Sequence, residues 1–526
     1  MVDRMEKPRT GIFDIGTKTP SSPQRRLASL HYDEEDTRKM RSHRLLRRGL
    51  GGAVLATLAL PSAALAQDRP SVESVLDQLN VTWVLVAAVL VMFMQAGFAF
   101  LEIGFSRGKN AGMGIAKIIV NFSIASIAWW VCGFGLAFGG GGWLFGDSGL
   151  FFHTGGTLAG EEIVGSTAAF MLFQFMFCAV SLAIVWGTTL ERIKFSAYVI
   201  YAMVFAALIY PLVAHWIFGG GLLAEIGGGV QDFAGSTVVH LVGATGAFAA
   251  LLLLGPRRGK YGPDGKPRAI PGHSMPLVGL GVLILWLGWF GFNGGSTLGT
   301  DGNRMAEVML VTQLGAAAGV IGASLVTWLK TRALDVGMSG NGAIAGLVAI
   351  TAPSGYVEFW AAPIIGLVGG VLVVYAVYAI EKKLDDPVGA LSAHGLAGIW
   401  GTLSCGLFTS TRLAELNGVG EPGLFYSGSF EQFGVQAVGV TAAFVTVFVL
   451  SYATFWVIKR TSGLRVSAEA EEAGLDISEH GMYGYPEQFI PQPEYSLGFP
   501  PPARAGAVAS SSPTRQPTVG EPATQS

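Results

Sequence analysis

Long apolar segments dominate this sequence, and their number and length constrain its fold more than any other feature. We count eleven of them between Leu79 and Ile458, each near the roughly 20 residues that an α-helix needs to cross a bilayer. Their predicted limits are 79–104, 114–139, 165–188, 195–220, 234–255, 274–296, 305–328, 338–353, 357–381, 389–409 and 433–458. Only 13% of the residues are charged, whereas a soluble protein has roughly 25%. The sequence therefore predicts an all-α polytopic membrane protein with eleven transmembrane helices.

Lysine and arginine residues are concentrated in alternate connections between these segments and in the chain that follows the last one. These basic residues are Arg107, Lys109, Arg192, Lys194, Arg257, Arg258, Lys260, Lys266, Arg268, Lys330, Arg332, Lys382, Lys383, Lys459, Arg460 and Arg465. The intervening connections carry almost none, with Arg304 and Arg412 as the exceptions. Because cytoplasmic loops are enriched in basic residues, we expect a multi-pass protein of the cell inner (cytoplasmic) membrane. Its mature N-terminus then lies outside and its C-terminus in the cytoplasm.

The two ends of the chain differ in composition from the apolar region. Residues 40–66 combine an arginine-rich start, a short apolar run and the tripeptide ALA ending at Ala66, which is the pattern of a secretory signal peptide. Residues 1–39, which precede Met40, are predicted to be a misassigned or disordered extension. We expect a membrane domain over 75–460, a cytoplasmic tail over 461–485, and a disordered segment rich in Pro, Ser, Thr and Gly over 486–526.

A nine-residue pattern, D-x-x-G-x-x-x-x-H, occurs twice. The first copy runs from Asp232 to His240 and the second from Asp386 to His394. The copies begin the fifth and the tenth predicted spans, as a five-plus-five duplication requires. Because five is odd, the second half enters the membrane from the opposite side, which predicts an inverted repeat followed by one extra C-terminal helix.

The repeat places both histidines deep in the membrane. Eight residues of helix carry each histidine about 12 Å inward from its aspartate, and the apolar core is about 30 Å thick. His240 and His394 therefore approach each other near the midplane, where the functional site of an inverted repeat usually lies.

The role of these histidines has several readings. A buried histidine can be an ordinary hydrogen-bonded core residue, but intramembrane ionisable groups are more often functional. Two imidazoles in contact can form a polar track or relay a proton along a central pore in each subunit. A metal site is a further reading, but no third ligand lies nearby in the sequence, so we expect no metal.

The two aspartates have a simpler reading. Asp232 and Asp386 each precede small residues at a predicted helix start, where a carboxylate caps free backbone N–H groups. We expect Asp386 to be such a structural helix cap. Asp232, on the outer side, can also favour cations at the entrance.

The sequence resembles the ammonium transporter (Amt/Mep/Rh) family of the bacterial Amt type from about Asn80 to Tyr485. The matching segments are QAGFAFLEIGFSR (95–107), ERIKFSAY (191–198), DFAGSTVVH (232–240), WFGFNGGS (289–296), DDPVGALSAHG (385–395) and GLRVSAEAEEAGLDISEHG (463–481). The resemblance implies eleven spans, an inverted repeat and a homotrimer. It also implies that the tail is regulatory and binds a PII-type protein on the cytoplasmic face.

The resemblance further implies roles for individual residues. These are twin pore histidines and proton relay at His240 and His394; a pore gate at Phe177 and Phe292; an outer NH4+ site at Phe218, Phe177, Ser296 and Asp232; and pore lining at Trp289 and Phe173. Phe218 stands where many relatives have tryptophan, and Trp216 lies two residues earlier. Because cation–π attraction is weaker over Phe than over Trp, the outer site is expected to be weaker here or rebuilt with Trp216.

The expected function is transport of ammonium or ammonia, with methylammonium as an analogue, through a lipid bilayer. NH4+ is recruited at the outer aromatic site and deprotonated, and ammonia then passes the histidines, since a bare charge in the apolar channel costs several kcal/mol. We expect no enzymatic activity and no cofactor. The net charge of −2 argues against nucleic acid as a partner. The alternatives are an ammonium sensor and a neutral gas (CO2) channel of the same fold.

Overall fold

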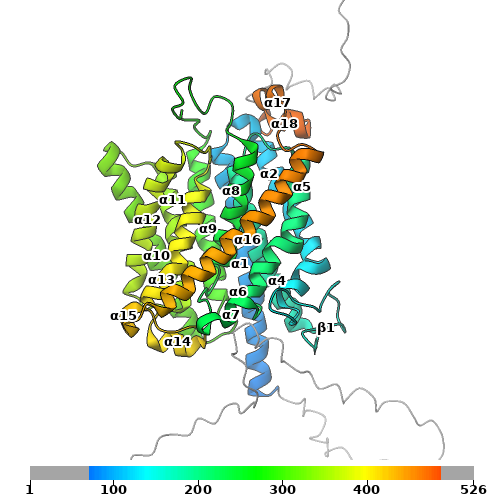
Figure 1. Cartoon of the computed structure of the whole chain (residues 1–526), viewed down its shortest axis with the longest axis vertical. Coiled ribbons are helices and arrows are strands. Elements are labelled where there is room, and N and C mark those ends of the chain that lie inside the picture. Colours follow the sequence, from blue (N-terminus) through cyan, green and yellow to red (C-terminus); the bar gives the residue numbers. More distant parts are fainter. Residues whose placement is uncertain (1–69, 487–526) are drawn as a thin grey trace, which may run out of the picture.

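The computed structural model describes residues 70–486. The predicted extension (1–39), the signal peptide (40–66) and all but the first residue of the predicted disordered segment (486–526) lie outside these residues. The described chain is a bundle of helices (Figure 1). The helices of the bundle are α1 (Val72–Phe105), α2 (Ala111–Ala128), α3 (Phe134–Phe138), α4 (Gly165–Thr188), α5 (Phe195–Val204), α6 (Tyr210–Ile217), α8 (Val242–Leu254), α9 (Met275–Gly295), α10 (Gly302–Thr331), α11 (Val336–Thr351), α12 (Ala361–Ile380), α13 (Ala397–Phe408) and α16 (Glu431–Thr461).

Short elements complete the bundle and its connections. Four π-helical segments are η4 (Trp129–Gly133), η5 (Phe205–Ile209), η7 (Ser236–Leu241) and η9 (Leu391–Leu396). The connections hold α7 (Leu222–Glu225), α14 (Thr411–Asn417) and α15 (Leu424–Ser427), and the 3-10 turns η3 (Gly108–Asn110), η6 (Ile226–Gly228) and η8 (Pro353–Gly355). The strands β1 (Thr157–Leu158) and β2 (Glu161–Glu162) pair antiparallel. The tail forms α17 (Ala468–Ala473) and α18 (Leu475–His480).

Within residues 70–486, nine helices are long and apolar enough to cross a membrane. They coincide with the first seven, the ninth and the eleventh predicted segments. The eighth is the 16-residue helix α11, and the tenth is divided into η9 and α13. The structure is thus that of a polytopic, all-helical membrane protein, as predicted.

Glycines allow several helices to pack backbone against backbone. A Cβ at Gly366 of α12 would clash with the carbonyl oxygen of Gly315 in α10, and one at Gly370 with that of Gly319. A Cβ at Gly342 of α11 would likewise clash with the side chain of Ala323 in α10. Close contact between small residues is a main source of helix association in lipid. The three helices α10, α11 and α12 therefore form one tightly packed unit.

The outer surface of the bundle is apolar. Large hydrophobic side chains such as Ile119, Leu283, Ile321, Leu325 and Val449 are exposed, and they belong to the long helices α2, α9, α10 and α16. Lipid tails can cover such a surface, whereas water cannot do so at low cost. The surface supports the assignment of these helices to a membrane.

The ends of the described chain lie at opposite ends of the bundle. In Figure 1, α1 begins below the bundle and α17 and α18 lie above it, while α16 crosses the front diagonally between α15 and the tail. We call the end that carries α17 and α18 the tail end. Basic connections meet the tail there: Lys109 donates to the carbonyl of Glu471, and Lys194 to that of Ser462.

Candidate functional site: a histidine pair in the bundle core

The first copy of the D-x-x-G-x-x-x-x-H pattern forms a capped turn that leads into η7. Gly235 has a φ of 116°, a left-handed conformation that favours glycine. Both Asp232 oxygens accept two backbone N–H groups each, from the four residues Gly235 to Val238, at distances of 2.8 to 3.0 Å. The carboxylate thus satisfies four donors that a helix start leaves free. His240 lies in the π-helix that follows.

The second copy has the same local structure, but its aspartate makes fewer capping hydrogen bonds. Gly389 has a φ of 74° and precedes η9, which carries His394. Asp386 Oδ2 accepts the N–H of Leu391 at 2.8 Å. The repeated sequence pattern is therefore matched by a repeated local structure: an aspartate, a left-handed glycine and a π-helix with its histidine.

The two histidines meet in the buried core. The Nδ1 atoms of His240 and His394 lie 3.2 Å apart, and the ring centroids 5.3 Å apart. In a hydrogen bond between two Nδ1 atoms, one imidazole donates and the other accepts. The remaining Nε2 atoms are then one acceptor and one donor. His240 Nε2 has no hydrogen-bond partner among the described residues, so this atom is free to contact a small polar solute.

Aromatic rings continue the line of the histidines on one side. Starting from Phe173, successive ring centroids lie 4.8 Å apart to Phe177, 4.1 Å to Phe292 and 5.6 Å to His240. Phe177 and Phe292 are stacked, with an angle of 8° between their planes. We call Phe173, Phe177, Phe292, His240 and His394 the ring column. The stacked rings leave no open space between them at this point of the column.

Trp289 packs against the column from the side. Its ring stacks on His240 at 5.1 Å, and its Nε1 donates to Thr351 Oγ1 at 2.8 Å. Ser236, also in η7, ties this π-helix to α11: its hydroxyl donates to Val348 O, and it accepts the N–H of Ala352. These contacts fix the orientation of the histidine ring.

The structure places the residues predicted for the outer site in different surroundings. Ser296 ends α9, and its hydroxyl donates to Phe292 O at 2.8 Å. Phe218 ends α6 and is buried, and within the described chain it makes no ring contact with the column. The Trp216 Nε1 donates to Leu144 O at 3.0 Å, so this indole N–H is held by the 139–146 connection. The structure thus brings Ser296 into contact with Phe292, whereas Trp216 is bound to Leu144.

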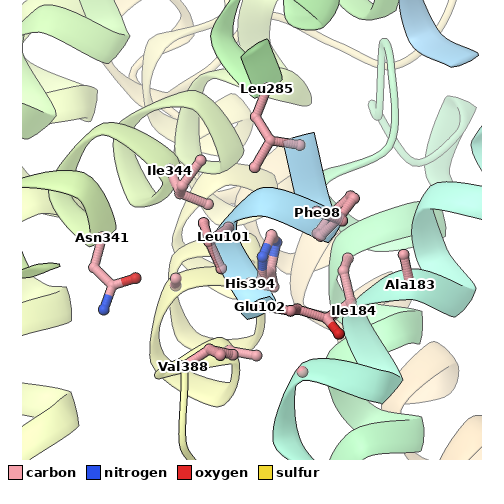
Figure 2. Close-up of a pocket in the computed structure, with 13 residues that line it drawn as sticks. Phe98, Leu101, Glu102, Ala183, Ile184, Leu285, Asn341, Ile344, Val388 and His394 are labelled. Carbon is pink, nitrogen blue, oxygen red and sulfur yellow. The ribbon is translucent and has the colours of Figure 1, made fainter. Parts of the chain in front are cut away.

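A small cavity lies on the tail side of the pair. It has a volume of about 20 Å³, and Figure 2 shows His394 among the residues that line it, with Phe98 and Ile184 on one side and Val388 on another. This volume holds about one water-sized molecule. The cavity therefore offers a position directly beyond His394.

Buried charged residues bind the chain just before the second motif, near the tail end of the bundle. Arg257 binds both oxygens of Asp385 at 2.9 Å, and Arg192 donates to the carbonyl of Asp385 at 2.8 Å. Burial raises the pKa of the Asp385 carboxyl, but the hydrogen bonds and charges of the two arginines outweigh it and lower this pKa to about 2. Asp385 directly precedes Asp386, so the charge cluster fixes the start of the second motif.

Sequence reasoning missed three features of this site. The π-helical form of η7 and η9 depends on packing against other helices and has no signature in the hydropathy pattern. Phe98, whose ring lies 6.3 Å from that of His394, looks like any apolar residue of a span. Glu102 and Lys117 could have been found, because both are ionisable residues within predicted spans and carry opposite charges.

The chain is similar to known proteins over most of its length. The pattern of the Ammonium Transporter Family matches residues 82–485, which is most of the chain. The chain belongs to this family. Ammonium transporter Amt2 of Archaeoglobus fulgidus is 43% identical over 462 residues, covering 85% of this chain and 97% of Amt2. The ammonium transporter of Bacillus subtilis is 35% identical over 406 residues, covering 76% of this chain and 96% of its own.

Solved structures of the family have the same fold. A protein described as a sensor Amt protein superposes with a TM-score of 0.71 at 36% identity, covering 78% of this chain and all of that one. Candida albicans Mep2 superposes with a TM-score of 0.69 at 28% identity, covering 82% of this chain and 95% of Mep2.

Proposed function

We propose that this member of the ammonium transporter family carries ammonium nitrogen across the membrane as ammonia, along the ring column and the histidine pair. The Nδ1–Nδ1 contact of 3.2 Å between His240 and His394 carries the proposal. It leaves one donor and one acceptor Nε2 in an apolar core, which suits a small solute that both donates and accepts hydrogen bonds.

The outer step depends on the loss of a proton. Ammonium is similar to potassium in size and charge, but only ammonium can become neutral. NH4+ gathers at Phe218, Phe177 and Ser296, near the Asp232 turn. A bare cation in the apolar core costs several kcal/mol, so NH4+ gives up a proton before neutral ammonia passes the gate.

The gate and the histidines then act in sequence. Rotation of Phe177 or Phe292 opens the stacked pair and admits ammonia. At the histidines the ammonia lone pair accepts from the donor Nε2, and an ammonia N–H donates to the acceptor Nε2. When the acceptor Nε2 gains a proton, the shared Nδ1 proton can move to the other ring as that ring loses its Nε2 proton; the two roles are then exchanged, and one proton has been relayed across the pair.

Several finer features belong to the same proposal. We infer eleven spans in an inverted repeat, because η7 and η9 share one motif geometry and α11 and η9 with α13 occupy the two remaining predicted spans. The tail end is then cytoplasmic, in the inner membrane, since the basic connections gather there. A homotrimer and a PII-type partner on α17 and α18 follow from family membership. Cysteine labelling from each side of the membrane tests the orientation.

Alanine substitution of each histidine tests the function. His240→Ala and His394→Ala, reconstituted in proteoliposomes, should lose most of the ammonium-driven current, while His153→Ala, in an exposed connection, should match the wild type. Wild-type currents in both pore variants would disprove the role of the pair. Potassium should give no current in any of them.

One observation favours a second candidate. A structural relative at 36% identity is described as a sensor, and a sensor binds ammonium without conducting it. Ammonium binding to the wild type without current in the same proteoliposomes would favour this candidate. A CO2 channel would instead accelerate acidification of the vesicles and would show no ammonium current.

A further inference from the structure

A second pair of charged residues is buried in the bundle beyond the histidines. Lys117 Nζ of α2 lies 3.1 Å from Glu102 Oε2 of α1, and the two residues are 0% and 1% exposed. Lys117 also donates to the carbonyl of Trp186 and lies 4.9 Å from the centre of the Tyr198 ring. The ammonium group of Lys117 is therefore surrounded by partners.

Glu102, unlike Lys117, is only partly satisfied, because only one of its two carboxylate oxygens accepts a hydrogen bond. Oε1 is buried and has no hydrogen-bond partner among the described residues. Buried polar atoms without a partner are rare in folded proteins and require an explanation. The ion pair with Lys117 accounts for the burial of Oε2, but it does not account for the burial of Oε1 without a partner.

The free oxygen faces the cavity beyond His394. Gly187 of α4 lines this cavity together with Glu102. A Cβ at position 187 would lie 3.7 Å from Glu102 Oε1 and would collide with Val388. Glycine at this position therefore leaves open the space in front of the oxygen. In Figure 2 the Glu102 carboxylate lies beside Ile184, with Asn341 on the far side of the cavity.

The cavity has the size and the chemistry of one ammonia molecule. Its volume of about 20 Å³ holds about one water-sized molecule. Its walls are mostly apolar, with His394 at one point and Glu102 at another. Lys117 pairs with Oε2 of Glu102 at 3.1 Å, so Oε1 stays free to accept a hydrogen bond from a molecule in the cavity.

We propose that Glu102 Oε1 is the acceptor of a second ammonium-binding position, on the tail side of the histidine pair. Ammonia leaving His394 enters the cavity and donates an N–H to Oε1. Its lone pair then takes the proton that the histidine pair relays: an N–H bond forms on the ammonia as an N–H bond of His394 breaks, and His394 regains a proton from His240 across the Nδ1–Nδ1 contact. The carboxylate holds the resulting ammonium ion until it leaves.

This inference rests on the proposed transport function, and substitutions that separate the free oxygen from the ion pair test it. In Glu102→Gln, the side-chain carbonyl turns to Lys117 and the NH2 group faces the cavity, so a donor replaces the acceptor. Lys117→Gln is the matched control, because it removes the same ion pair but keeps a donor to Oε2 and leaves Oε1 in place. The double variant Glu102→Gln/Lys117→Gln removes both charges together and replaces Glu102→Gln if that variant does not fold.

The measurement is ammonium current as a function of concentration, with ammonium added on either side of oriented proteoliposomes. For Glu102→Gln we expect the half-saturating concentration on the tail side to rise about ten-fold, the effect of losing one hydrogen bond to a charged acceptor. The half-saturating concentration for ammonium added on the opposite side should change by less than about two-fold, because that ammonium binds first at the outer site. Lys117→Gln should resemble the wild type on both sides.

Two results would overturn the inference while the transport function stands. One is an unchanged tail-side value in Glu102→Gln. The other is an equal rise in Glu102→Gln and Lys117→Gln, which would make the pair purely structural. If the wild type carries no ammonium current, the transport function itself fails and this inference fails with it.

Discussion

The Asp232 carboxylate holds more backbone donors than any ordinary helix cap, and its removal is the sharpest test of how the first histidine is positioned. Both oxygens accept two N–H groups, at 2.8 to 3.0 Å. The side chain is only 5% exposed, so water does not replace these bonds freely. We therefore expect substitution at Asp232 to act on stability and on transport together.

The size of the effect follows from the number of bonds. Asn has one acceptor oxygen, so Asp232→Asn keeps at most two of the four bonds and turns its NH2 toward the other two donors. Hydrogen bonds to charged groups are worth about 1.5–3 kcal/mol each, so the loss of two costs about 3 kcal/mol or more. Asp232→Ala leaves all four donors free and, at the same value per bond, should cost about 6 kcal/mol or more, which is exceptional for one substitution.

Thermal melting of the purified protein and ammonium current in proteoliposomes measure the two consequences. The melting temperature should fall from wild type to Asn to Ala, and the current should fall in the same order, because His240 lies in the π-helix that the cap begins. The reasoning is refuted if Asp232→Asn melts like the wild type. A loss of affinity without a loss of stability would instead show that Asp232 acts through its charge at the entrance.

Two further predictions concern the outer site and the charge cluster at the tail end. Phe218→Trp should lower the half-saturating ammonium concentration about two- to five-fold, because cation–π attraction over Trp exceeds that over Phe by about 0.5–1 kcal/mol; an unchanged or higher concentration would remove Phe218 from the cation site. The Asp385 carboxyl ionises more readily in the folded protein, where its pKa is about 2, than in the unfolded chain, where it is near 3.8. Its contribution of about 2 kcal/mol is therefore fully present above about pH 4 and is lost as the pH falls through 2. The difference in melting temperature between wild type and Asp385→Asn should shrink over this range, and a constant difference would argue against the shifted pKa.

The helical fold could be predicted because hydropathy is a local property of the sequence. A span such as 165–188 shows its length and its apolar character without any tertiary information, and α4 has these same limits. The approach of His240 to His394 could be predicted for a different reason. The repeated pattern and the odd number of predicted spans before the second copy predict both histidines at one depth, and the structure places their Nδ1 atoms 3.2 Å apart.

Other features depend on contacts between distant segments and could not be predicted in this way. Lys109 meets the carbonyl of Glu471 from 362 positions away, and nothing in either local sequence indicates the pairing. The free oxygen of Glu102 depends on Gly187, which belongs to another helix. The ring column was expected only from resemblance to a family, because a phenylalanine in a span has no feature that separates a pore residue from a lipid-facing one.

The π-helices that carry the two histidines have a consequence for how each span is divided. A π-helical turn holds more residues than an α-helical turn, and one extra residue rotates everything after it by about 100° relative to an unbroken helix. The fifth span therefore presents one face before η7 and another face after it, and the tenth span does the same around η9. Each of these two spans can thus turn its histidine toward the other histidine and still turn the rest of the helix toward its neighbours. A one-residue deletion within η7 would preserve hydropathy and length almost unchanged, yet it would redirect every side chain of α8.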